Sequence, residues 1–105
     1  MSTNVSHNEA KNRYELRVDD HLVGVAQYHR NEDQLDFTHT EVAPDHERQG
    51  RGTVLIEAAL DDVRRQSLTV LPHCWFMRDH IAEHPDQYLA LVPAERRAQF
   101  RLPTA

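Results

Sequence analysis

Residues 37–60 read FTHTEVAPDHERQGRGTVLIEAAL, and the character of this stretch changes twice. Its first part continues a strand that we predict from Leu35 through Val42, with Leu35, Phe37 and His39 on one face. Pro44 ends this strand because it has no N–H for the sheet ladder. After a polar loop, from Thr53 onward, apolar residues recur at helical spacing: Leu55, Ile56, Ala59, Leu60 and Val63. The stretch therefore predicts a strand, a glycine-containing loop and a helix that ends near Gln66.

Two earlier segments predict further strands. Apolar residues alternate with polar ones over residues 14–18, and residues 22–28 form a second apolar run. Polar turns at residues 19–20 and 31–33 join these segments to the strand at 35–42. Because the turns are short, we expect an antiparallel three-stranded meander.

The rest of the chain predicts a crossover and a second helix. Residues 68–71 predict a buried strand that returns parallel to residues 35–42 through a right-handed crossover. Residues 75–84 predict a helix with Phe76 and Ile81 inward, terminated by Pro85. We therefore expect a compact α/β fold of the α+β type. Its single domain covers residues 13–93, between a loose polar tail at 1–12 and a partly mobile tail at 94–105.

Composition limits the classes of function. The chain has 105 residues, 39% hydrophobic and 28% charged, which suits one globular domain. A net charge of -5 and the lack of basic runs disfavour nucleic-acid binding. Cys74 is the only cysteine, which excludes an intrachain disulfide and a multi-cysteine zinc site. No segment approaches the ~20 apolar residues of a membrane span, so we expect a cytoplasmic protein without a membrane partner, most simply a monomer.

The loop from Glu47 to Thr53 has the chemistry of an anion site. The first N–H groups of a helix lack intrahelical partners and the macrodipole adds positive charge, so both favour a phosphate or pyrophosphate. Glycines at 50 and 52 would let the backbone approach the anion, and arginines at 48 and 51 could add charged hydrogen bonds. The alternative is that the glycines only make the turn into the helix. The loop lacks the lysine of a P-loop and the third glycine of a Rossmann fingerprint.

The order of motifs resembles that of the GCN5-related N-acetyltransferases, and especially the small single-domain branch of that superfamily. The resemblance spans residues 35–92 and rests on His39-Thr40-Glu41-Val42, the glycine loop, Ala58-Ala59-Leu60 and Pro72-His73-Cys74-Trp75-Phe76. It implies acetyl-CoA as the cofactor, its pyrophosphate on the glycine loop, its pantetheine between the strands at 35–42 and 68–72, and a backbone oxyanion donor near Val42. The residues implied to contact the cofactor are Val42, Ala43, Arg48, Gln49, Gly50, Arg51, Gly52, Thr53 and Phe76.

Two loop positions depart from the pattern of these enzymes. Glu47 stands where the superfamily has Arg or Gln, so pyrophosphate contacts would rest on Arg48, Gln49 and backbone N–H groups. Arg51 stands where the branch usually has an aliphatic residue. Its guanidinium either strengthens phosphate binding or points to water.

Three residues are candidates for chemistry. Cys74 follows the second strand of the crossover, where the resemblance places the acetyl-bearing sulfur, so a thiolate there could accept the acetyl group. The alternative is a small buried hydrophobe. His39 and Glu41 are candidate general bases for the amine, against a structural histidine and a solvated strand end. His80 and His84 lie at i,i+4 without a zincin pattern, so we expect surface histidines and no metal.

These features predict an N-acetyltransferase that moves acetyl from acetyl-CoA to an amine, by direct attack or through an acyl-Cys74 intermediate. The acceptor would be a protein Lys, a protein N-terminus or a small polyamine. The lack of N-terminal helices that wall the substrate site in larger members favours a Lys on another protein. The main alternative is an acyl-CoA-binding or sensing module with little turnover. A third hypothesis is an interaction domain in which the glycines are turn chemistry only.

Overall fold

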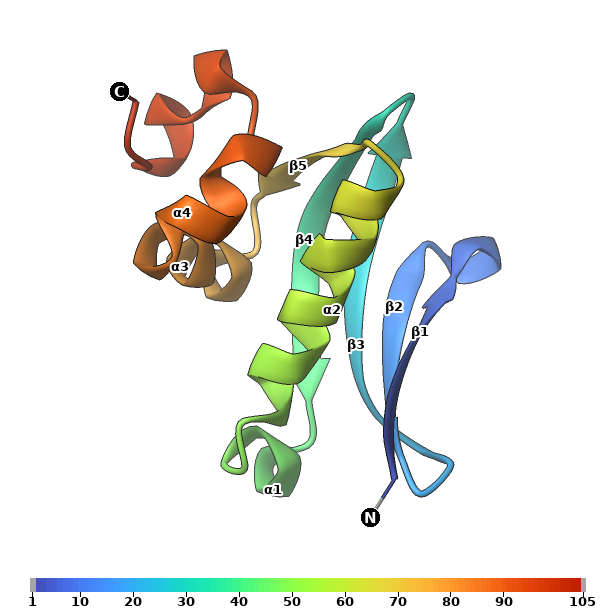
Figure 1. Cartoon of the computed structure of the whole chain (residues 1–105). Helices are drawn as coiled ribbons and strands as arrows, with labels where there is room; N and C mark the ends of the chain where they lie inside the picture. The colour runs from blue at the N-terminus through green and yellow to red at the C-terminus, as the bar shows by residue number, and fades with distance from the viewer. Residues whose placement is uncertain (1, 105) are drawn as a thin grey trace.

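A five-stranded sheet with a long helix across one face forms the framework of the computed structural model, which describes residues 2–104 (Figure 1). Met1 and Ala105, the outer ends of the two predicted tails, lie outside the described residues. The strands are β1 (Thr3–Asn8), β2 (Arg13–Val18), β3 (His21–Asn31), β4 (Gln34–Val42) and β5 (Thr69–Pro72), in that spatial order. The first four are antiparallel, and β5 pairs parallel with β4. The predicted mixed fold and parallel crossover are confirmed.

The helices follow the strands in the chain. They are α1 (Pro44–Glu47), α2 (Arg51–Arg65), α3 (Trp75–Glu83) and α4 (Pro85–Tyr88). Short 3₁₀ turns complete the described chain: η1 (Glu9–Lys11), η2 (Leu89–Leu91), η3 (Ala94–Arg96) and η4 (Ala98–Phe100). Within residues 2–104, no helix has the length and apolar character needed to cross a membrane.

The α2 helix carries the predicted core. Its five periodic apolar residues are all fully buried: Leu55, Ile56, Ala59, Leu60 and Val63. The helix begins at Arg51, two residues before the predicted start, and gives way to Gln66 as its C-cap. The α2 axis runs along the sheet in Figure 1, so its N-terminus comes to the end of the sheet where β4 finishes.

The N-terminal segment differs from its prediction. Residues 3–8 form β1 along the free edge of β2, in register from Thr3↔Val18 to Asn8↔Arg13. The prediction of a loose tail over residues 1–12 is therefore wrong from Thr3 onward, and the meander has four strands instead of three. The sequence of this strand shows no alternation of apolar and polar residues, because the polar His7 occupies a core-facing position. Its ring stacks on that of Tyr14, with centroids 4.2 Å apart.

A polar cluster ties the first three strands to α2. The Tyr14 hydroxyl donates to Asp62 Oδ2 at 2.6 Å, and His7 Nδ1 lies 3.4 Å from the same carboxylate oxygen. His7 Nε2 also contacts the Tyr28 hydroxyl at 2.5 Å. Burial, together with the hydrogen bond to Asp62, raises the pKa of Tyr14 far above its ordinary value, so this donor stays protonated at any physiological pH.

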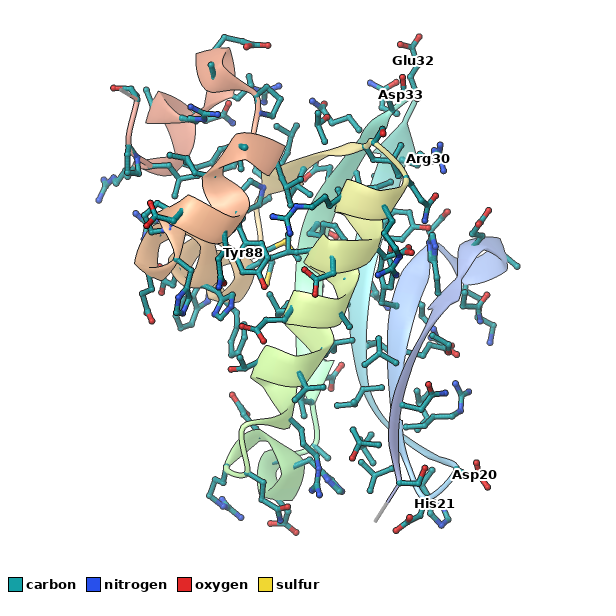
Figure 2. All side chains as sticks on the ribbon, viewed as in Figure 1. Asp20, His21, Arg30, Glu32, Asp33 and Tyr88 are labelled. Atoms are coloured by element: carbon teal, nitrogen blue, oxygen red, sulfur yellow. The ribbon has the colours of Figure 1, made fainter. Side chains whose placement is uncertain are left out.

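The C-terminal segment is also ordered against the fold. Over the described residues the predicted tail at 94–105 packs against the domain, because Phe100 and Leu102 are buried. Arg78 of α3 donates to the carbonyls of Phe100 and Arg101, both at 2.8 Å. Upstream, Tyr88 points from α4 toward α2, where the Arg64 guanidinium lies 5.6 Å from its ring centroid (Figure 2). Figure 2 also shows the tips of the two long hairpins, Asp20–His21 and Arg30–Asp33, at opposite ends of the sheet.

Candidate functional site

A bulge in β4 sets the direction of every side chain beyond it. Tyr28 pairs with Phe37 and Gln27 with His39, so Thr38 has no partner on β3. One extra residue reverses which side chains face the core. Phe37 is buried before the bulge, whereas the exposed His39 lies on the opposite face after it. The prediction that His39 shares a face with Phe37 is wrong.

Beyond the bulge, β4 and β5 part. Their parallel pairing ends at Phe37↔Pro72, and the N–H of Cys74 closes it by donating to the Phe37 carbonyl at 2.7 Å. The last residues of β4, 38–42, therefore have β3 on one side and no strand on the other. This parting leaves an open strand edge in the middle of the fold.

The hydrogen-bonding groups at this edge follow from the ladder. The N–H of Ala43 donates to the Val23 carbonyl at 2.8 Å, and Val42 pairs with Gly24. Because backbone groups alternate in direction along an antiparallel strand, Glu41 turns its N–H to β3, while Thr40 and Val42 turn theirs to the open edge. Two backbone donors and their carbonyls are thus presented where β5 is missing.

Cys74 lies at the point of parting. It is the N-cap residue of α3 and is 8% exposed. Its thiol donates to the Thr40 hydroxyl across 3.1 Å, so its side chain bridges the two strands as they separate. The sulfur therefore lies at the position predicted for the acetyl site. It is also buried, which is what the alternative of a small buried hydrophobe requires.

The two loop positions 50 and 52 require glycine for different structural reasons. Gly50 is the N-cap of α2 with φ of 78°, and a Cβ there would meet no atom within 4 Å. Glycine is required here by the left-handed backbone, which opens on solvent. Gly52 is buried, and a Cβ there would lie 3.2 Å from the Phe76 ring and 3.8 Å from Val42 Cγ2. Gly52 therefore lets α2 approach α3 and β4 closely.

The start of α2 has free anion-binding capacity in its backbone. No side chain caps it, and no acidic residue lies in its first turn. In its first turn, the N–H groups of Gly52 and Thr53 consequently have no intrahelical acceptor. A bound anion is one of the ways in which such groups are satisfied.

The polar side chains of the loop hold one another. Arg51 contacts His46 Nδ1 at 2.7 Å and Gln49 Oε1 at 2.5 Å. Arg48 pairs with Asp45 at 2.5 Å, with both side chains well exposed. Arg48 could exchange its partner for a stronger anion at small cost, because exposed ion pairs contribute little free energy.

Two neighbouring hollows lie near the end of β4, the smaller at its open edge and the larger between α2 and α3. The smaller, of about 180 Å³, is lined by Thr40, Glu41, Val42, Glu47 and Phe76. The larger, of about 300 Å³, is lined by Glu47, Thr53, Trp75, Phe76, Asp79, His80 and Glu83. They share Glu47 and Phe76, so they form one groove between α2, α3 and β4. Three carboxylates give the larger hollow an acidic lining.

His39 and Glu41 share one face of β4, as predicted, but that face is the outer one. Their closest atoms, Nε2 and Oε2, are 3.4 Å apart, and the side chains are 55% and 75% exposed. Glu41 also borders a third hollow of about 280 Å³, together with Ala43 and the β3 residues Leu22–Val25. The predicted base candidates thus face away from Cys74, whose sulfur contacts Thr40 on the inner side.

The predicted surface location is wrong for His80. His80 is buried, with Nε2 at 3.1 Å from Glu57 Oε2 of α2 and its ring 4.6 Å from that of His84. Within residues 2–104, no three His, Cys, Asp or Glu side chains gather closely enough to hold a metal ion.

Sequence reasoning missed three side chains at the site. Thr40 contacts Cys74 because the bulge turns it inward, and no sequence signal marks a bulge of this kind. Asp36 binds the ring of His73 across the two parallel strands, which requires their register to be known. Glu57 meets His80 only through the packing of α2 on α3.

Comparisons with known proteins agree with this geometry. The sequence matches the family described as GCN5-related N-acetyl-transferase over residues 13–91. Among solved structures, the fold is similar to the ribosomal-protein-S18-alanine N-acetyltransferase from Escherichia coli, with a TM-score of 0.52 and 22% sequence identity. That match covers 55% of this chain and 38% of the other, so the chain spans well under half of that enzyme. No curated protein sequence matches significantly.

Proposed function

Because this chain belongs to the GCN5-related N-acetyltransferase family, we propose that it transfers an acetyl group from acetyl-CoA to an amine. The observation that carries the proposal is the parting of β4 and β5 after Phe37. An extended amide-bearing chain such as pantetheine can add to an open strand edge, and here Thr40 and Val42 present the backbone groups for it. The smaller hollow of the groove lies at that edge, and the larger one adjoins it at Glu47 and Phe76.

The N-terminus of α2 is the proposed binding site for the phosphate groups of the cofactor. Its uncapped N–H groups and helix dipole favour an anion, and the open space around Gly50 leaves room for one. Arg48 and Arg51 can turn to phosphate oxygens from their present partners. Gly52 contributes by close packing against Phe76, which shapes the groove. These residues fit the group, with the carboxylate of Glu47 as an unfavourable charge nearby.

The residues of the open edge suit acyl transfer. The thioester supplies an activated acetyl group, and the N–H of Val42 or Thr40 is a fixed donor for a developing oxyanion. The surroundings of the Cys74 thiol favour direct attack by the amine on the thioester and disfavour an acyl-Cys74 intermediate. Its thiol is buried and hydrogen-bonded to Thr40, and its neighbour His73 is engaged with Asp36 on the other side of the backbone.

A protruding amine on another protein is the acceptor that we propose. The net charge of -5 and the exposed Glu41 carboxylate favour a cationic partner. The structurally similar enzyme is named for acetylating an alanine of a ribosomal protein, which supports a protein acceptor. A second candidate function, CoA binding with little turnover, is favoured by the high exposure of the two predicted bases, His39 and Glu41.

The experiment is a free-thiol assay with acetyl-CoA and three acceptor classes: Lys-containing peptides blocked at their N-terminus, peptides with a free N-terminus, and polyamines. We expect thiol release that depends on one acceptor class. In Cys74→Ala, release should continue within about tenfold of wild type, since the proposed amine attack is direct. Loss of turnover in Cys74→Ala with CoA affinity intact would contradict direct attack. CoA binding without turnover for any acceptor would support the binding module, and absence of both would contradict the proposal.

A further inference from the structure

His73 and Asp36 form a carboxylate–imidazole pair outside the groove. His73 follows Pro72 at the end of β5, and its Nδ1 is hydrogen-bonded to Asp36 Oδ1 of β4. The side chains are 41% and 31% exposed. The ring is also held by an edge contact to Phe100, with centroids 4.9 Å apart. Two elements far apart in sequence thus fix the orientation of one imidazole.

The hydrogen bond defines the role of each ring nitrogen. An ionised carboxylate only accepts, so Nδ1 of His73 donates to Asp36 and Nε2 of the neutral ring carries the lone pair. Nε2 faces the side-chain amide of Gln99 at 3.4 Å, a long contact that a substrate N–H could replace. The pair therefore leaves a basic nitrogen oriented and accessible.

His73 lines a hollow beside the groove. The hollow measures about 250 Å³ and includes His73, Trp75, Arg78 and Gln99 in its lining. Trp75, which is 73% exposed, also lines the larger hollow of the groove, so the two spaces border the same residue. Cys74 lies between them in the chain. The imidazole consequently sits at the rim of the parting between β4 and β5.

The charged side chains around the His73–Asp36 hydrogen bond do not compete for it. From α3, the Arg78 guanidinium binds Asp79 at 2.6 Å and donates to two C-terminal carbonyls. From the C-terminal segment, the Arg101 side chain lines the same hollow. Asp36 of β4 is the carboxylate that contacts the ring itself. By comparison, His39 and Glu41 are more exposed, and their mutual contact is 3.4 Å long.

We propose that His73, held by Asp36, is the general base that accepts the proton of the acceptor amine. This inference rests on the acetyl transfer proposed above. The amine nitrogen forms a bond to the acetyl carbon, the carbon–sulfur bond breaks, and its electron pair leaves on sulfur, which is protonated from solvent. The proton of the attacking nitrogen passes to His73 Nε2, and Asp36 stabilises the resulting imidazolium. His39 and Glu41 then have no part in proton transfer.

The test compares kcat/KM against pH in four variants: His73→Gln, Asp36→Asn, His39→Gln and Glu41→Gln. His73→Gln should lower kcat/KM by about 10²-fold or more and remove the acidic limb of the profile, with CoA affinity unchanged. Asp36→Asn should displace that limb and lower kcat/KM by about tenfold, because the ring loses its fixed tautomer. His39→Gln should keep the wild-type profile. Glu41→Gln should keep the acidic limb, because its carboxylate takes part in acceptor binding and not in proton transfer.

Each other outcome has a definite meaning. An unchanged profile in His73→Gln, or loss of the acidic limb in His39→Gln or Glu41→Gln, would overturn the assignment of the base alone. A His73→Gln protein that no longer binds CoA would show a structural role and overturn it as well. No turnover in the wild-type protein would overturn the proposed function together with this inference.

Discussion

At the scale of single residues, the glycine loop combines a favourable backbone with one unfavourable side chain. Gly50 provides the left-handed turn and Gly52 the close packing on Phe76, so both glycines have structural reasons that the alternative reading of the loop anticipated. The capacity for an anion resides in the uncapped N–H groups that follow. Glu47 lines both hollows of the groove and opposes a polyanionic ligand there.

Neutralising Glu47 should therefore tighten CoA binding. A carboxylate several ångströms from a pyrophosphate, screened by water and salt, costs roughly 0.5–1 kcal/mol. In Glu47→Gln we expect the Kd for CoA to fall about two- to fivefold, measured by calorimetry at low salt.

The matched control is Glu83→Gln, since Glu83 lines only the larger hollow. Its effect on the Kd should be smaller than that of Glu47→Gln. Equal effects of the two substitutions, or weaker binding in Glu47→Gln, would mean that the phosphates do not approach the start of α2.

At the scale of elements, the sequence predicts the helices and strands that have a clear hydrophobic period. It does not predict features that depend on how one strand pairs with another. The strand, loop and helix over residues 35–66 were predictable because the period changes sharply from two to 3.6. The bulge at Thr38 was not, because a one-residue slip depends on how β4 meets β3. β1 was missed because His7, a polar residue, faces the core and finds its partners only in the fold.

The carboxylate of Glu15 in β2 gives a pH-dependent contribution to stability. Glu15 of β2 is nearly buried and accepts hydrogen bonds from Arg13 and Arg17 of its own strand and from Asn8 of β1. The bond from Arg17, with those from Arg13 and Asn8, overcomes the effect of burial and lowers the pKa of Glu15 to about 2 from its usual 4.5. The stabilisation is thus present above pH 4.5 and is lost as pH falls toward 2.

We expect Glu15→Gln to lower the free energy of unfolding by about 1–3 kcal/mol at about pH 7, measured by urea denaturation. Near pH 3.5 the difference from wild type should be clearly smaller, since the wild-type carboxylate has then lost part of its advantage. Glu32→Gln, in the exposed turn between β3 and β4, serves as the control and should change little at either pH. A Glu15→Gln deficit of equal size at both pH values would contradict the ion-pair account.

At the scale of the whole molecule, one sheet defect organises the site. β4 and β5 pair at one end and part at the other, α2 brings its N-terminus to the open end, and α3 begins at the point of parting (Figure 1). The larger hollow of the groove lies on the α2 side, whereas the side chains of His39 and Glu41 and the His73–Asp36 pair lie toward the other side. A thioester reaching the parting from one side could thus meet an amine arriving from the other.

The central claim is that the cofactor adds to the open edge of β4, and amide hydrogen exchange tests it most directly. Exchange rates of β4 amides would be measured by NMR with and without saturating CoA. The account predicts that Thr40 and Val42 exchange at least about tenfold more slowly in the complex, because their N–H groups gain acceptors. Glu41 and Ala43, already bonded to β3, should change far less. CoA binding that leaves the exchange of Thr40 and Val42 unchanged would contradict the account.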